Sequence, residues 1–232
     1  MNKLVVFALL LFSALLFITG GCKKNEGYTI TQDSISSLPE VTAYDIEGNL
    51  YHGAYIGSQI WMVENLKTTR FRDGTPIARK DDQAEWTGMS DSLPLYCNYN
   101  NDDYLGSVYG KLYNRNVIFD TLNIAPAGWR VPTIADWDTL LAYLGGSSVA
   151  GNKLRESGTD HWLGPNSSTN SSGFTALPGG TRNNAGFSNL SLKAKFWCNW
   201  PYLSYSIDGS GIVSCDSSSA RFYGLSIRCI KE

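Results

Sequence analysis

The sequence has little charge and almost no histidine. Charged residues make up 17% of its 232 positions, and His52 and His161 are its two histidines. Lys and Arg total 19 against 21 Asp and Glu, so there is no basic excess of the kind that nucleic-acid binding requires. The sequence also lacks C-x-x-C and H-x-x-x-H spacings, which argues against a structural zinc site.

The sequence has no long apolar run after its first residues. Residues 4–18 are apolar apart from Ser13 and follow Lys3, which is typical of a signal peptide and too short for a transmembrane helix. Thr19, Gly20 and Gly21 then precede Cys22 in a lipobox-like order. We expect residues 1–21 to be removed and Cys22 to carry lipid, which would anchor the protein to a lipid bilayer, here the bacterial outer membrane. An ordinary signal peptide with a chance cysteine and a true membrane span are the alternatives.

The segment after Cys22 contains few apolar residues. Residues 22–40 lack the periodicity of a helix or a strand, and we interpret them as a lipidated tether. The domain is expected to occupy residues 41–232. Its composition, poor in charge and rich in Gly, Asn, Ser and Tyr, favours an extracellular fold with many loops and strands.

Four cysteines remain once Cys22 is lipidated. An even number outside the cytoplasm predicts two disulfides, for which three pairings exist. A local bridge between Cys198 and Cys215 would leave Cys97 to pair with Cys229.

Local patterns predict hairpins, strands and one clear helix. Turn residues at 47–49 and 57–58 indicate two hairpins, and residues 133–144 fit an amphipathic helix that Thr133 caps and Gly145 ends. The alternation at 225–230 predicts a half-buried strand, and residues 174–177 another strand before a tight turn. Residues 72–94 are expected to be irregular, and residues 107–119 fit a helix or a strand equally well.

Seven segments together carry a family resemblance. In order they are 44–51 (YDIEGNLY), 60–67 (IWMVENLK), 73–77 (DGTPI), 109–114 (YGKLYN), 125–133 (APAGWRVPT, with Trp137 after it), 173–180 (GFTALPGG) and 226–229 (SIRC). In this order they resemble the Fibrobacter succinogenes major paralogous domain over residues 41–232. That family in turn resembles the C-type lectin-like superfamily, which also includes the sulfatase-modifying factors.

The resemblance implies a fold and a location more than an activity. It implies a single α+β domain with mixed and antiparallel sheets and long loops, carried on surface lipoproteins. It also implies a Cys97–Cys229 pair, because these cysteines match the family's usual ones, whereas Cys198 and Cys215 look like an addition of this chain.

The sequence shows no convincing catalytic set. Neither histidine has a nucleophile motif nearby, and the acidic pair Asp102–Asp103 is expected to be a solvated loop. The reactive cysteine pair of the sulfatase-modifying enzymes is also missing, because Cys215 and Cys229 are too widely separated. We therefore expect no enzymatic activity.

Aromatic and amide side chains favour binding instead. Aromatic faces stack on sugar rings and amides bind hydroxyls, and the segments 196–202 and 96–104 concentrate both. The candidate contact residues are Trp197, Trp200, Tyr202 and Tyr99; the alternative is that Trp197 and its neighbours pack in the core.

A second candidate site is a short loop rich in oxygen ligands. Asn98, Asn101, Asp102 and Asp103 offer the side chains that calcium prefers, although their spacing is not that of an EF-hand. Calcium is therefore the one cofactor that the sequence suggests.

Two classes of function follow. The first is a non-catalytic binding or adhesion module for a polysaccharide, facing the periplasm or the cell surface. The second is a structural surface protein that binds other proteins; a carbohydrate-active or sulfatase-modifying enzyme is the least favoured reading.

Overall fold

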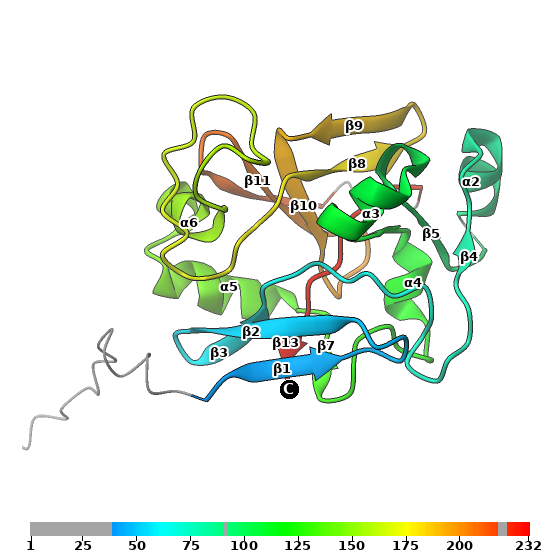
Figure 1. Ribbon diagram of the computed structural model, residues 1–232, viewed down its shortest axis with the longest axis horizontal. Coiled ribbons are helices and arrows are strands. Elements are labelled where there is room, and N and C mark those ends of the chain that lie inside the picture. The colour runs from blue at the N-terminus through cyan, green and yellow to red at the C-terminus, as the bar shows by residue number, and fades with distance from the viewer. Residues whose placement is uncertain (1–38, 91, 218–221) are drawn as a thin grey trace, which may run out of the picture. The chain divides into compact units, whose positions relative to one another are not determined.

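A computed structural model describes residues 39–90, 92–217 and 222–232 (Figure 1). The predicted signal peptide at 1–21, the lipidated Cys22 and the tether up to residue 38 lie outside the described residues. Within the described residues, no helix combines the length and the apolar character needed to cross a membrane.

The largest sheet contains both ends of the domain. Its five strands pair antiparallel in the order β1-β2-β3-β13-β7. The turns at Gly48 and Gly57 have φ of +82° and +62°, a backbone conformation that glycine adopts at little cost, and they confirm the two predicted hairpins. The strands are β1 (Val41–Tyr44), β2 (Leu50–Ile56), β3 (Gln59–Met62), β7 (Trp129–Arg130) and β13 (Ile230–Lys231).

The remaining strands form three smaller sheets. An antiparallel sheet contains β10 (Lys193–Trp197), β11 (Ser204–Asp208) and β12 (Val213–Asp216). A mixed sheet contains β4 (Ala78–Arg79), β5 (Leu95–Cys97) and β6 (Leu112–Tyr113), and a hairpin contains β8 (Gly179–Asn183) and β9 (Gly186–Leu190). The mixed α+β class is therefore confirmed.

Two strand predictions were wrong. Residues 225–230 are all buried, and a strand forms only at its end, because this segment runs through the core instead of along a surface. Residues 174–177 form a single bridge, between Arg155 and Ala176, and the strand begins later, at Gly179.

The predicted amphipathic helix is α5 (Ile134–Tyr143). Thr133 Oγ1 accepts from the Asp136 backbone N–H, and the Asp136 carboxylate accepts from the Thr133 backbone N–H at 2.7 Å, so the capping box is complete. Burial by itself raises the pKa of Asp136, but hydrogen bonds from Arg130 and Thr133 outweigh burial and lower this pKa to about 2. The other helices are α2 (Gln83–Met89), the 3-10 turn η1 (Tyr99–Asn101), α3 (Asp103–Tyr109), α4 (Arg115–Phe119) and α6 (Ser147–Leu154).

Helix α5 lies between the five-stranded sheet and the β10-β11-β12 sheet (Figure 1). Trp137 stacks on Tyr205 with ring centres 4.5 Å apart, and it also contacts Trp61 and Phe174. These rings are all nearly or fully buried. The aromatic layer therefore joins both sheets to α5.

Three buried arginines hold the long loops in place. Arg155, Arg182 and Arg228 are at most 2% exposed, and each guanidinium stacks on an aromatic ring and donates to backbone carbonyl oxygens. No carboxylate among the described residues forms an ion pair with any of them. Carbonyl dipoles thus compensate the buried charge.

The expected disulfides are not formed. Cys97, Cys198, Cys215 and Cys229, all within the described residues, are free thiols. Cys97 and Cys229 pack into different hydrophobic clusters. Cys198 follows β10 and Cys215 lies on β12, with β11 between them, and two strand spacings of about 4.8 Å each exceed the Cα separation of about 7 Å that a disulfide tolerates.

Candidate ligand-binding surface at the β10–β11 hairpin

The turn between β10 and β11 presents two aromatic side chains to solvent. Trp200 is 57% exposed and Tyr202 is 43% exposed. The Trp200 N–H donates to the Cys198 carbonyl at 2.7 Å, and the Leu203 N–H donates to the Trp200 carbonyl at 3.2 Å, so the turn is ordered by its own backbone. Tyr202 has φ of +62°, an unusual conformation for a bulky residue.

Helix α4 extends this aromatic surface. The guanidinium carbon of Arg115 lies 4.5 Å from the centre of the Tyr202 ring, which is a cation–π distance. Phe119 is 43% exposed and follows Arg115 by one helical turn, on the same side of α4. We call Arg115, Phe119, Trp200 and Tyr202 the hairpin surface.

Two polar features accompany the hairpin surface. The Nε atom of Arg115 is buried and has no hydrogen-bond partner among the described residues. The exposed Asn199 is held in place because its N–H donates to the Pro132 carbonyl at 2.7 Å. The guanidinium of Arg115 beside Tyr202 and the exposed residue Asn199 therefore add polar groups to the flat apolar rings.

The structure corrects the prediction for Trp197. This side chain is fully buried, and its Nε1 donates to the Tyr113 carbonyl at 2.7 Å. Strand β10 is covered on both faces, with Phe196 in one hydrophobic cluster and Trp197 in another. Trp197 is a core residue and contributes nothing to the surface.

Tyr99 also has a packing role. Its ring lies 5.2 Å from the Phe187 ring, centre to centre, and it borders the cluster around Trp86. It therefore lies apart from the hairpin residues with which the sequence grouped it.

The predicted calcium ligands are partly engaged by protein groups. The Asp103 carboxylate accepts from Arg79 and from Asn98, both at 2.7 Å, and Asp102 caps α3. The Asn101 amide donates to the Asp81 carbonyl at 3.0 Å. The described part of the chain holds no group of three or more His, Cys, Asp or Glu side chains that could bind a metal ion. These hydrogen bonds use the amide nitrogens of Asn98 and Asn101 and one Asp103 oxygen, while Asn98 Oδ1 is buried without a hydrogen-bond partner among the described residues, so calcium at this loop stays a prediction.

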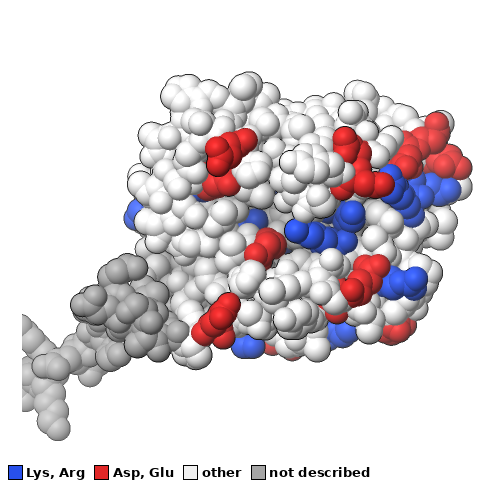
Figure 2. Space-filling view, in the orientation of Figure 1, with Lys and Arg blue, Asp and Glu red and all other residues white. Residues whose placement is uncertain are grey.

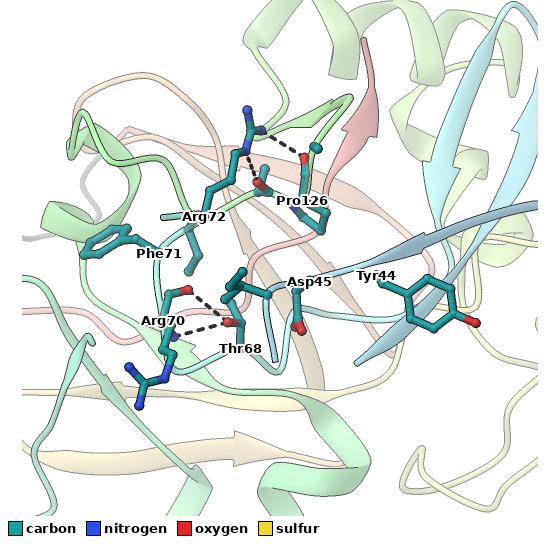
Figure 3. A pocket seen from close by; sticks show the side chains of 11 residues that line it. Tyr44, Asp45, Thr68, Arg70, Phe71, Arg72 and Pro126 are labelled. Carbon is teal, nitrogen blue, oxygen red and sulfur yellow. Dashed lines mark hydrogen bonds between the residues drawn. The ribbon is translucent and has the colours of Figure 1, made fainter. Parts of the chain in front are cut away.

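A small cleft lies beside β1, between the turn at Thr68–Arg72 and the segment 124–127 (Figure 3). Its volume is about 160 Å³, below the range of about 300–1,000 Å³ that is usual for small-molecule sites. Arg72, at its edge, donates to the carbonyls of Ala125, Pro126 and Trp129. The other charged residues that line the cleft, Asp45 and Arg70, also form hydrogen bonds within the fold.

Each histidine is paired with a glutamate. His52 Nδ1 lies 2.7 Å from a Glu64 oxygen, and His161 Nδ1 lies 2.8 Å from both Glu156 oxygens. The Tyr109 ring meets His161 edge-on at 5.5 Å. That neither histidine is catalytic stays a prediction.

Comparison with known proteins identifies the family. The model of the Fibrobacter succinogenes major domain matches residues 55–231. The chain belongs to this family. No curated protein and no solved structure matches the chain. The Fibrobacter major domain includes the whole hairpin surface, from Arg115 to Tyr202.

Sequence reasoning found half of the hairpin surface. Trp200 and Tyr202 were named from their aromatic neighbourhood, but Arg115 and Phe119 were missed. Both belong to a segment whose pattern fitted a helix or a strand, and in the structure that segment contains the end of α3, β6 and α4.

Proposed function

We propose that this protein is an outer-membrane lipoprotein and a non-catalytic binding module, and that its hairpin surface contacts a glycan. The observation that carries this proposal is the pair of exposed aromatic rings, Trp200 and Tyr202, on an ordered turn.

The chemistry of the hairpin surface suits sugars. A pyranose ring has an apolar face of C–H groups that stacks on indole and phenol rings, while its hydroxyls need hydrogen-bond partners. Arg115 supplies donors beside Tyr202, and an arginine has five N–H donors but no acceptor. The strained backbone at Tyr202 is consistent with a functional position, since strain gathers at such sites.

The anchor is proposed from the sequence. Two or more acyl chains on Cys22 would give stable attachment to the membrane, and the polar residues that follow would hold the domain away from it. The domain would then face the periplasm or the medium.

We also propose that the fold is C-type lectin-like. Two features favour it: the first and last strands of the domain share one sheet, and the segment APAGWRVPT leads directly into α5. Helix α4 and the turn between β10 and β11, which carry the hairpin surface, lie between these parts in the sequence.

A protein partner is the second candidate. Trp, Tyr and Arg are the residues that contribute most to protein–protein binding energies, and the hairpin surface contains all three. The glycan is favoured because Asn199, beside the rings, is exposed and offers an amide to hydroxyls.

The test is a binding screen on the full chain in a non-ionic detergent. The protein is presented to a panel of plant and host polysaccharides, with calcium and with chelator. We expect saturable binding to one polysaccharide class, unchanged by chelator, because the Asn98–Asp103 loop is not part of the hairpin surface.

The control is a matched pair of aromatic substitutions. Trp200→Ala is expected to abolish binding, whereas Tyr104→Ala, at a tyrosine that is 72% exposed on α3, is expected to leave it unchanged. No binding across the panel by folded protein, or equal loss in both variants, would contradict the glycan proposal.

A further inference from the structure

Two lysines meet where the chain crosses itself between β3 and β6. The Lys111 N–H donates to the Leu66 carbonyl at 3.0 Å, and the next residue, Lys67, donates its own N–H to the Tyr51 hydroxyl at 2.9 Å. A Cβ on Gly110 would lie 2.8 Å from the Leu66 oxygen. The two lysine backbones are therefore held side by side by a crossing that tolerates only glycine at position 110.

Neither ammonium group has a direct anionic partner. Within the described ranges, no carboxylate lies within 4 Å of Lys67 or Lys111, while Arg79, their basic neighbour, is paired with Asp81 and Asp103. Both lysines are only partly exposed. In Figure 2, blue Lys and Arg atoms gather near the middle of the displayed face, with red Asp and Glu atoms around them.

The charged form of Lys111 is disfavoured in the free protein. Burial lowers the pKa of Lys111, and the charges of Arg79 and Lys67 lower it further, against the opposing effect of Asp103 and Glu47. An added negative charge between the two ammonium groups would relieve both the lost solvation and the repulsion.

Glu47, one of the two acids whose charge acts on Lys111, is held by a threonine. Thr69 Oγ1 donates to a Glu47 carboxylate oxygen at 2.6 Å, and this hydrogen bond fixes the carboxylate. Tyr96 is half-buried in the same group of charges, near Arg79 and Glu47. Each of the two acids that act on Lys111, Glu47 and Asp103, thus accepts a hydrogen bond from another side chain.

From this arrangement we propose that Lys67 and Lys111 form a binding site for an oxyanion: a carboxylate, sulfate or phosphate group of an anionic ligand. Two ammonium groups act as point charges and do not select between planar and tetrahedral anions as a guanidinium fork does. The site uses none of the residues of the hairpin surface, so it is independent of the proposed function.

The experiment titrates the full chain, in non-ionic detergent, with three probes: inorganic sulfate, inorganic phosphate and digalacturonate. Binding is measured by calorimetry at low ionic strength, where charge interactions are least screened. We expect saturable binding of at least one probe, and the probe that binds most tightly names the group that the site prefers.

Two variants and a matched control assign the site. Lys67→Gln and Lys111→Gln are each expected to weaken binding about tenfold, the loss of one charge-assisted hydrogen bond. Lys193→Gln, on β10 in a different sheet, should leave the affinity unchanged. Urea unfolding of each variant shows whether the fold is intact.

A second measurement does not depend on substitution. In protein whose lysines carry ¹³C-methyl groups, the resonances of Lys67 and Lys111 should shift when the probe is added, and the pKa of Lys111 should rise. The absence of saturable binding for all three probes would overturn the proposal. So would equal losses in Lys193→Gln and Lys111→Gln, or lysine resonances that do not move.

Discussion

Arg228 donates two hydrogen bonds to a single oxygen, Oδ1 of Asn65, from Nε at 3.0 Å and from Nη2 at 2.7 Å. The same guanidinium donates to the carbonyls of Phe174 and Thr175 and lies 4.3 Å from the centre of the Phe174 ring. Burial lowers the pKa of Arg228 to about 9. Arg228 therefore joins the last segment of the chain to the loop before β8 and to the segment after β3.

Loss of this arginine should be costly. Arg228→Met would leave Asn65 Oδ1 and two carbonyl oxygens without donors, and each buried unsatisfied group costs about 1–3 kcal/mol. We expect the free energy of unfolding, measured by urea denaturation, to fall by about 3 kcal/mol or more. Arg79→Met, which removes two partly exposed ion pairs, should cost about 1 kcal/mol or less. Similar values for the two variants would contradict the role given to Arg228.

Asp136 should make stability depend on pH in acid. Its folded pKa is about 2, below the ordinary value of 3.8, so its stabilising effect is complete above about pH 4 and is lost as the pH falls toward 2. Asp136→Asn removes the ion pair with Arg130 and half of the capping box. In urea titrations we expect the variant to be less stable by about 1–2 kcal/mol at neutral pH, with a smaller further loss between pH 4 and pH 2 than the parent shows. If Asp136→Asn and the parent lost the same stability between pH 4 and pH 2, Asp136 would not be the group that makes stability depend on pH in acid.

The four thiols should differ sharply in reactivity. Cys215 is exposed, while Cys97, Cys198 and Cys229 are buried, and burial raises the pKa of Cys97 to about 11 and that of Cys198 to about 12. The thiolate is the reactive form. Alkylation of the folded protein at pH 8, followed by peptide mass mapping, should therefore modify Cys215 first and the other three only after unfolding. Recovery of a Cys97–Cys229 or Cys198–Cys215 bridged peptide from the folded protein would show that the free-thiol state is not the mature one.

The two tryptophans of the 196–202 segment should respond oppositely to substitution. Trp197→Ala removes a fully buried ring and its hydrogen bond, and we expect a loss of about 3–5 kcal/mol in unfolding free energy. Trp200→Ala removes an exposed ring and should change stability by less than about 0.5 kcal/mol. Urea unfolding of the two variants checks this, and a large loss in Trp200→Ala would mean that its ring packs in the fold.

Local signals predicted the hairpins at Gly48 and Gly57 and the helix α5, because each depends on residues close in sequence. The same reasoning could have found α2: Asp82 accepts from the Glu85 N–H at 2.9 Å, a cap with an acidic residue three positions later. That signal was lost among turn-forming neighbours. Trp86, whose burial holds α2 in place, contacts Arg182 from a distant part of the chain.

Non-local packing explains the other differences. Alternation separates inside from outside only where one face of a strand meets solvent, and β10 is covered on both faces, so the pattern could not assign Trp197. Arg115 reaches Tyr202 through the tertiary fold alone, and no local motif marks it. Arg79, from β4, donates to Asp103 in the oxygen-rich loop at 98–103, a contact that no local pattern predicts.

Trp200 gives the most direct test of the hairpin surface. All seven tryptophans lie within the described residues; the other six are at most 3% exposed, whereas Trp200 is 57% exposed. Acrylamide quenching of tryptophan fluorescence should therefore report mainly on Trp200, and Trp200→Phe should remove most of the quenchable signal. The measurement is this quenching with and without a saturating amount of the polysaccharide that binds in the screen. We predict that bound polysaccharide protects the quenchable tryptophan; unchanged quenching at full saturation would show that the ligand binds elsewhere and would contradict the account.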